Sequence, residues 1–334
     1  MNISVIVPAY QAAAVLPQCL TALQQQTIDR SQYEIIVVDD GSTDGTAAVA
    51  EQALRNFPAA QCIHAEHGGP AHARNLGAGA AQGDLLLFTD ADCEPLPDWI
   101  EQFARVFRDP AIGGARGAYV TRQRSLVARF VQQEYEERYD YARRQPTIDF
   151  IDTYSAGYRR EVFIKNGGFD AVAFPTASVE DQEFSFRLAA RGYRLIFAPD
   201  VKVNHRHGAS LARYFRRKIN IGFWKMHVLK RYPGKAVRDS HTPQLMKVQI
   251  ALLAAALCSL FGLFWLPFGP LCAIELWIAV GLSMLPLLIK IARRDPPVLL
   301  IAPIMILVRT LALGLGLLGG ILRFYIFRFD SSPA

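Results

Sequence analysis

The sequence predicts an α/β domain with a mostly parallel, Rossmann-like sheet, followed by a basic segment and an α-helical membrane tail. Three observations lead to this expectation. Short β-branched runs alternate with helical patterns over the first 110 residues, as in doubly wound sheets. Residues 1–200 carry 18 Lys and Arg against 26 Asp and Glu, whereas residues 201–238 carry eleven basic residues and no acidic one. The run from Val248 to Ile274 contains no charged residue.

Composition narrows the class of protein. Hydrophobic residues make up 51% of the 334 residues and charged residues 20%, which excludes a disordered or collagen-like chain. The five cysteines show no C-x-x-C spacing, so neither a zinc site nor a disulfide framework is expected. The apolar run at the start is short and follows no basic residue, which indicates a buried strand rather than a signal peptide. The basic excess adjoins the apolar tail, which favours contact with anionic lipid and argues against nucleic acid.

The alternating elements can be placed in order along the chain. Strands are expected over 3–7, 34–38, 61–65 and 84–89, and helices over 15–25, 43–56 and 70–81. Ligands of such sheets bind at the carboxyl ends of the strands. The residues that follow each strand are therefore the candidates for binding and catalysis.

Asp39 and Asp40 follow the strand at 34–38 and precede a glycine turn. One acidic side chain would suffice to cap the next helix. The adjacent pair therefore also suggests acceptors for a nucleobase and a ribose. Two glycines precede the helix that begins near Pro70, and Arg74 lies one turn into it. Arg74 is either a ligand of a diphosphate or base, or an ordinary exposed helix residue.

Two further acidic pairs belong to the same pattern. Asp90 and Asp92 directly follow a buried apolar strand, and two carboxylates spaced in this way suit a hard cation such as Mg²⁺ or Mn²⁺. A D-x-D pair by itself is also a common surface feature. Glu180 and Asp181 open a later helix, where acidic residues also complement the helix dipole.

The order of these pieces resembles the inverting family-2 glycosyltransferases of GT-A fold. The pieces are VIVPAY, VVDDGSTDGT, GGPAHARN, TDADCEP, GGFD and EDQEFSFRLAARGYRL, within roughly residues 1–225. The resemblance implies a metal-dependent enzyme that uses a nucleotide-diphosphate sugar and Mg²⁺ or Mn²⁺, with Asp181 as catalytic base and a metal site at Asp92 and His205. The positions that it implies for nucleotide binding are Pro8, Tyr10, Asp39, Asp40, Arg74, Asp90 and Glu180.

The sequence departs from the usual family pattern in four places. Gln11 and Gly157 stand where the family often has Asn, and Val179 where it commonly has Gly. The change at Gly157 puts the acceptor contacts in doubt. The basic segment also lacks the Q-x-x-R-W motif of processive synthases, so a single addition per acceptor is expected.

The remainder of the chain predicts membrane association. After a catalytic domain at 1–210, a basic amphipathic collar at 211–244 is expected to lie among lipid headgroups, unless it packs on the domain as a solvated face. Within 245–325, three apolar segments are long enough, or nearly so, to cross a hydrocarbon layer of ~30 Å. These segments are 248–266, 269–289 and 298–322.

Charge placement predicts the topology of this tail. Basic residues on both sides of the first two segments place both ends in the cytoplasm, giving a multi-pass protein of the inner membrane with a cytoplasmic catalytic domain. The third segment is either a span or a re-entrant or tilted helix. Glu275 and Arg309 are expected to pair or to line a polar groove. The glycines from Gly314 to Gly319 predict a helix-packing face.

Three functions remain open. The first is a membrane-anchored, inverting transferase that moves a sugar to a hydroxyl of a lipid-linked or membrane-proximal acceptor, for a cell-envelope polysaccharide or glycolipid. The second is a polyprenyl-phosphate glycosyltransferase, whose anionic acceptor has little need of a base. The third is a catalytically silent membrane scaffold, which the intact acidic set argues against.

Overall fold

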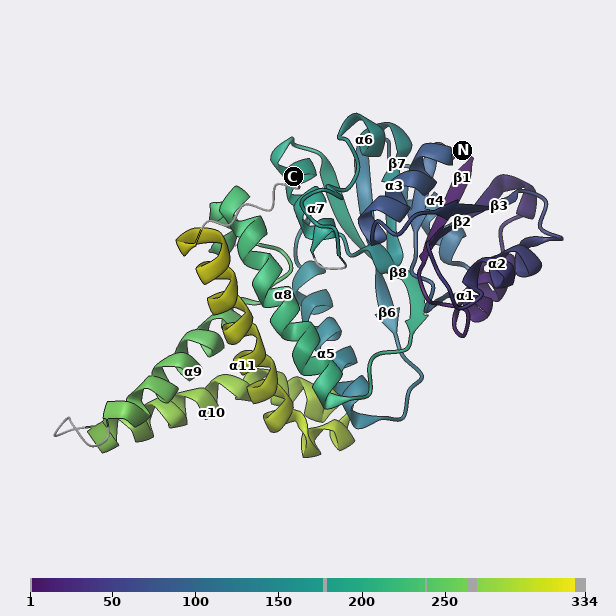
Figure 1. Ribbon diagram of the computed structural model, residues 1–334. Coiled ribbons are helices and arrows are strands. Elements are labelled where there is room, and N and C mark those ends of the chain that lie inside the picture. The colour runs from purple at the N-terminus through teal and green to yellow at the C-terminus, as the bar shows by residue number, and fades with distance from the viewer. Residues whose placement is uncertain (1, 177–178, 238, 263–268, 328–334) are drawn as a thin grey trace. The chain divides into compact units, whose positions relative to one another are not determined.

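The computed structural model describes residues 2–176, 179–237, 239–262 and 269–327 (Figure 1). The chain divides into two compact units. The first comprises residues 1–122 and 142–206, and the second comprises 123–141 and 207–334. The segment 123–141 thus belongs to the second unit although it connects two strands of the first.

The first unit is built on an eight-stranded sheet with the order β3-β2-β1-β4-β7-β6-β8-β5. The strands are β1 (Ile3–Ala9), β2 (Tyr33–Asp40), β3 (Ala60–Ala65), β4 (Leu85–Phe88), β5 (Cys93–Pro95), β6 (Ile112–Val120), β7 (Ala156–Arg159) and β8 (Arg194–His205). Strands β3, β2, β1 and β4 pair in parallel, as the strict alternation of strand and helix predicts. The α/β fold is confirmed, but the sheet is mixed, because β7 runs antiparallel to β4 and β6, and β5 antiparallel to β8.

Helices cover both faces of this sheet. They are α1 (Leu16–Gln24), α2 (Thr46–Leu54), α3 (Pro70–Ala80), α4 (Trp99–Val106), α6 (Arg160–Lys165) and α7 (Glu180–Ala190). On one face, α3, α6 and α7 bury an aromatic cluster in which the rings of Phe163 and Phe184 lie 5.0 Å apart. This cluster gives the helices that carry candidate site residues a rigid base.

The second unit contains five helices in its described part. They are α5 (Leu126–Ala142), α8 (Leu211–Arg231), α9 (Gln244–Gly262), α10 (Gly269–Arg294) and α11 (Ala302–Ile321). Helix α8 runs beside α11 (Figure 1), and glycines permit their close approach. A Cβ on Gly316 would lie 2.2 Å from the carbonyl oxygen of Ile219, and one on Gly222 would lie 2.6 Å from that of Leu313. The expected glycine packing face is confirmed.

Two helices of the described chain, Gly269–Arg294 and Ala302–Ile326, are long and apolar enough to cross a membrane. This judgement rests on length and composition alone. The expected segment 248–266 ends outside the described residues, and its described part belongs to α9, in which Gln244–Leu260 counts as a shorter apolar helix.

The expected pairing of Glu275 with Arg309 is wrong. Glu275 is exposed, whereas the Nη1 of Arg309 lies 3.4 Å from the Oε1 of Glu134 and its Nη2 donates to the side-chain oxygen of Gln249 at 2.8 Å. The reason is α5, a helix that the sequence analysis did not assign. It brings Glu134 into the second unit from a position between two strands of the sheet.

Candidate active site

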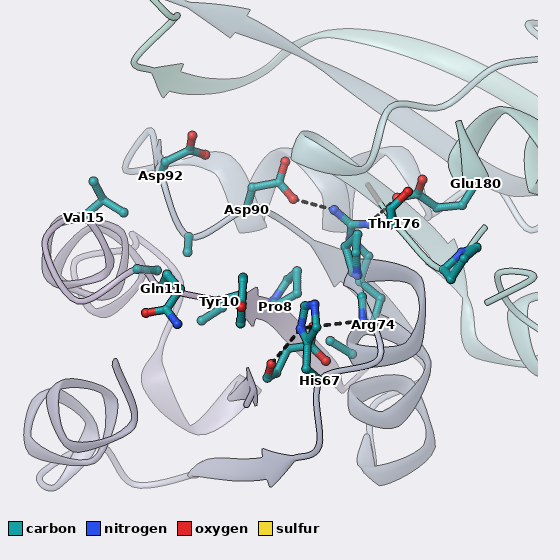
Figure 2. Close-up of a pocket in the computed structure, with 18 residues that line it drawn as sticks. Pro8, Tyr10, Gln11, Val15, His67, Arg74, Asp90, Asp92, Thr176 and Glu180 are labelled. Carbon is teal, nitrogen blue, oxygen red and sulfur yellow. Dashed lines mark hydrogen bonds and ion pairs between the residues drawn. The ribbon is translucent and has the colours of Figure 1, made fainter. Parts of the chain in front are cut away.

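The candidate site is a pocket of about 610 Å³ at the carboxyl ends of β1, β2 and β4 (Figure 2). Seven predicted residues line this pocket: Pro8, Tyr10, Asp40, Arg74, Asp90, Asp92 and Glu180. Three others, Asp39, Asp181 and His205, are not among its lining residues. The lining also includes Gln11, His67 and Thr176, which the sequence analysis did not select.

Arg74 lies in the wall of the pocket between two carboxylates. Its Nη2 is 2.7 Å from the Oδ1 of Asp90, and its Nη1 is 2.9 Å from the Oε1 of Glu180 (Figure 2). The guanidinium is buried, and its Cζ lies 6.0 Å from the ring centre of Phe169. This geometry joins the end of β4 to the start of α7 and neutralises two acidic side chains that would otherwise repel each other.

The loop that carries the GGFD sequence is fixed to the same helix. The Asn75 side chain donates to the carbonyl oxygen of Phe169 at 2.7 Å and accepts from its N–H at 2.9 Å. Gly168 adopts φ +61°, and a Cβ there would lie 2.5 Å from the Asn75 side-chain oxygen. Arg74 and Asn75 are consecutive residues of α3. Together they connect the carboxylates of the pocket wall, Asp90 and Glu180, to this loop.

Asp92 and His205 lie together at the other end of the D-x-D turn. The Oδ2 of Asp92 is 3.3 Å from the Nε2 of His205. The imidazole is buried and stacks on Tyr119 with ring centres 4.4 Å apart. Asp92, Cys93 and His205 each offer one ligand atom within 4.8 Å of the others. A carboxylate oxygen and an imidazole nitrogen suit Mn²⁺ or a similar divalent cation.

Asp40 is fully engaged by the loop at 67–69. Its Oδ1 accepts from the N–H of Gly68 and its Oδ2 from that of Gly69, both at 2.9 Å, and its Oδ2 is also 2.9 Å from the Nδ1 of His67. Gly69 adopts φ +85°, and a Cβ there would lie 2.2 Å from the carbonyl oxygen of Pro175. Asp40 therefore shapes the rim of the pocket. Asp39, beside it, is buried and accepts from the N–H of Ser42 at 3.3 Å.

Two aromatic rings form a flat surface at this rim. Tyr10 stacks on His67 with ring centres 4.2 Å apart and an angle of 24° between the planes. Both side chains are about half exposed. His67 follows β3 and so lies at the same sheet edge as the predicted acidic residues. Its position just after a predicted strand is the feature of the sequence from which His67 could have been predicted as a site residue.

Gln11 is the described non-glycine residue with positive φ, at 49°. Its N–H donates to the Ser42 hydroxyl and its side-chain amide to the Thr43 hydroxyl, both at 3.0 Å. These bonds tie the end of β1 to the turn after β2. Asn adopts this conformation more readily than Gln, which accounts physically for Asn being usual at this position.

Three carboxylates open α7, and their partners differ. Glu180 pairs with Arg74, and Glu183 pairs with Arg187 at 2.6 Å. Asp181 accepts from the N–H of Gln182 at 2.8 Å and makes no direct ion pair among the residues that the structure describes, although the charge of Arg74 acts on it. Burial, together with the negative charges of Glu180 and Asp152, raises the pKa of Asp181 well above its ordinary value.

The change at Gly157 lies away from the pocket. A Cβ at this position in β7 would lie 2.9 Å from Phe107 and 3.0 Å from both Leu87 and Phe103. Phe103 belongs to α4, so position 157 faces the side of the sheet that α4 covers. Phe88, two residues before the pocket residue Asp90, faces the opposite side of the sheet. Glycine is therefore required here by packing under α4.

Comparison with known proteins shows which families and folds this chain resembles. The model of "Glycosyl transferase family 2" matches residues 4–167. Glycosyltransferase AglE of Haloferax volcanii is 30% identical over 60% of this chain and 65% of its own length. The pre-mycofactocin glycosyltransferase of Mycobacterium tuberculosis is 28% identical over 70% of this chain and 49% of its own length. The chain thus covers less than two thirds of these relatives.

A solved structure shares the fold. The mannosyltransferase PcManGT of Pyrobaculum calidifontis, in complex with GDP-Man and Mn²⁺, superposes with a TM-score of 0.57. The match covers 95% of this chain and 87% of the other, at 22% identity. The GT-A fold is thereby shown.

Proposed function

Because residues 4–167 of this chain belong to glycosyl transferase family 2, we propose that the protein is a metal-dependent, inverting glycosyltransferase. Its donor is a nucleotide-diphosphate sugar, and its acceptor is a hydroxyl of a lipid-linked or membrane-proximal glycan. The donor class is supported by the PcManGT complex with GDP-Man and by the pocket at the sheet edge. The pocket volume suits a small-molecule ligand.

One observation carries the proposed mechanism. Of the three acidic residues that open α7, Asp181 is the one that makes no direct ion pair in the described chain, so its carboxylate is available to accept a proton. Its raised pKa makes it a stronger base than an ordinary aspartate. Asp181 takes the hydroxyl proton while the acceptor oxygen bonds to the anomeric carbon. The bond from that carbon to the diphosphate breaks, and the nucleoside diphosphate leaves.

The other site residues bind and orient the donor in this proposal. The stacked Tyr10 and His67 offer a flat surface to the nucleobase, with Asp39 as an acceptor nearby. Asp40 holds the rim loop. Arg74 is a positioning residue, because both ends of its guanidinium are already bound by Asp90 and Glu180.

Asp92 and His205 are the residues that would hold a divalent cation, which when bound would offset the negative charge on the leaving diphosphate. Their donor atoms fit Mn²⁺ or Mg²⁺, and the stacking of His205 on Tyr119 fixes the imidazole orientation. EDTA should abolish transfer, and Mn²⁺ or Mg²⁺ should restore it. Asp92→Asn should weaken Mn²⁺ binding at least ~10-fold in a calorimetric titration. Full transfer in EDTA would remove the cation from the mechanism.

The helical unit supplies membrane attachment in this proposal. Two apolar helices have the length to cross a bilayer, and α8 exposes basic side chains that suit anionic headgroups, among them Arg213, Arg216 and Lys230. By the positive-inside rule the catalytic unit lies on the cytoplasmic face of the inner membrane, where nucleotide sugars are made. A lipid-linked acceptor would then lie beside the catalytic unit, for synthesis of an envelope polysaccharide or glycolipid.

The test of this function is Asp181→Asn, which preserves the shape of the side chain and removes its basicity. Single-turnover transfer should fall by ~10²- to 10⁴-fold, the usual contribution of a general base. Donor affinity, measured by calorimetry with bound Mn²⁺, should stay within about twofold, since Asp181 does not line the donor pocket.

The matched control is Glu183→Gln on the same helix. It removes the ion pair with Arg187, which also donates to the carbonyl oxygens of Asn166 and Gly168, so it should lower thermal stability more than turnover. Near-normal transfer by Asp181→Asn would exclude the hydroxyl acceptor. It would favour a polyprenyl-phosphate acceptor, which is already anionic and needs no base.

A further inference from the structure

We propose that α11 lies along the membrane–water interface instead of crossing the bilayer, with one stripe of its side chains facing the acyl chains. This inference rests on the membrane attachment proposed above. It specifies which helices of the second unit enter the bilayer and which lie at its surface. The partner of the stripe is a lipid surface with anionic headgroups.

The exposed side chains of α11 form a single stripe. Ile304, Leu311, Leu315, Leu318 and, just past the end of α11, Leu322 follow one another at spacings of seven, four, three and four residues, and exposed Pro303 and Ile321 widen the stripe to one side. Such spacing puts them on one face of a helix. The opposite face, which includes Met305, Arg309, Ala312, Gly316 and Gly320, is buried within the second unit.

Helix α10 has the reverse pattern. Its buried side chains form the narrow stripe, with Ala273, Val280, Met284, Leu287 and Ile291 among them. Most of the remaining circumference is exposed and apolar. A helix surrounded by lipid on most sides is expected to look like α10, whereas α11 exposes one side only.

The protein face of α11 is covered by a charged helix. Along α8, Gly222 packs against Gly316, and Met226 lies against Gly320, so the two helices stay together over several turns. Figure 1 shows α8 and α11 side by side along their lengths. Helix α8 also exposes basic side chains near its two ends: Arg213, Arg216, Arg217, Lys230 and Arg231.

A buried ionic cluster adds α5 to this pair. Glu134 of α5 lies 3.0 Å from the Nζ of Lys218 on α8 and 3.4 Å from the Nη1 of Arg309 on α11. Helix α5 carries further charges, including Glu136, Glu137 and Asp140. If α11 crossed the bilayer, α8 and α5 would enter the hydrocarbon with it. Ions there are strongly disfavoured. With α11 in the plane of the interface, both charged helices lie on its water side.

The start of α11 is tied to the same charged layer. At the end of α10, Arg294 pairs with Asp140 at 2.6 Å, and Asp295 just after it pairs with Arg129 of α5. The chain therefore leaves the α9–α10 hairpin at the level of α5 and enters α11 there. In this arrangement the hairpin inserts into the bilayer, and α11 returns along its surface. Arg323, which follows α11, then stays at the interface from which the hairpin inserts.

Depth measurements on the full chain test this placement. Exposed Cys258 and Cys272, and half-buried Cys62, are first replaced by Ser. Single cysteines at Ile304, Leu311, Leu318 and Leu322 then carry nitroxide labels in nanodiscs with anionic lipid, and electron paramagnetic resonance reads their immersion depth. Because Ile304 and Leu322 are about 27 Å apart along a helix, a crossing α11 would put Leu311 on the order of 10 Å deeper than either end. The expected result is one shallow depth at all four positions.

Labels on α10 are the matched control. Replacements of Leu271, Ile278 and Ile289, which are all exposed, should give depths that differ by on the order of 10 Å if the hairpin inserts. A depth gradient on both helices would overturn the in-plane placement and leave the glycosyltransferase proposal intact. Labels on both helices that remain in water would overturn the membrane attachment itself, and the in-plane placement with it.

Discussion

Each unit of the molecule contains a buried arginine held by side chains from distant parts of the chain, and the two arginines serve different purposes. Arg74 lies between Asp90 and Glu180 in the wall of a pocket of about 610 Å³. Arg309 lies between Glu134 and Gln249, is 1% exposed, and does not line that pocket.

The difference shows that a buried ion pair does not by itself mark a functional site. Asp92 comes two residues after Asp90 and lies beside His205, and Asp181 directly follows Glu180. The first unit therefore has acidic groups next to Arg74 and its partners that can hold a cation or accept a proton. In the second unit, Lys218 and Arg309 enclose Glu134 from two helices. The charges of these three side chains offset one another, and their ion pairs hold α5, α8 and α11 together.

The largest expected effect comes from replacing each arginine with methionine, which should show that the two arginines have different roles. Removing one partner of a buried pair typically costs ~3–5 kcal/mol, because the other charge stays buried. Arg309→Met should lower the free energy of unfolding by about that amount in detergent and leave donor affinity unchanged. Arg74→Met should lower stability and also abolish donor binding, because Asp90 and Glu180 then repel each other. Calorimetry and chemical denaturation give both quantities. Normal donor affinity in Arg74→Met would mean that Arg74 is as purely structural as Arg309.

Acid should break the ion pairs between Glu134, Lys218 and Arg309 by protonating Glu134. Burial alone would raise the pKa of Glu134, but the charges of Lys218, Arg309 and Arg138 lower it from 4.5 to about 2. The unfolded chain therefore binds this proton first, so the stabilisation is complete above about pH 4.5 and falls as the pH drops toward 2. The difference in unfolding free energy between wild type and Glu134→Gln should shrink by about 2 kcal/mol from pH 6 to pH 3. A difference that does not change with pH would show that Glu134 is not ionised in the fold.

Glycine substitutions on α11 should give the smallest effect. Gly316→Ala places a methyl group 2.2 Å from the carbonyl oxygen of Ile219, and overpacking of this kind costs ~1–3 kcal/mol, partly offset by about 1 kcal/mol of helix propensity. We expect a net loss on the order of 1 kcal/mol. Gly314→Ala meets only the Ile250 side chain at 3.6 Å and should be neutral or stabilising. Equal melting temperatures for the two variants would mean that α8 and α11 are farther apart than described.

Local patterns were sufficient for much of the first unit. The strands at 3–7, 34–38, 61–65 and 84–89 and the helices between them are confirmed within a few residues. Short, almost fully buried apolar runs mark the central strands, and one buried face marks each helix. The parallel strands bring their carboxyl ends to one sheet edge. For this reason Asp40, Asp90 and Asp92 line one pocket although fifty residues separate the first from the others.

The tertiary structure alone decided which charges meet. The sequence predicted Glu275 as a partner of Arg309 and suggested no protein partner for Arg74, whereas their guanidiniums contact Glu134, 175 residues away, and Glu180, 106 residues away. It also gave no sign that α5, inserted between β6 and β7, packs with the C-terminal helices. Residue order determines periodicity and the ends of strands, because these depend on near neighbours. Ion pairing in the interior depends on strand register, loop path and the distance of helix approach, and these are set only when the whole chain packs.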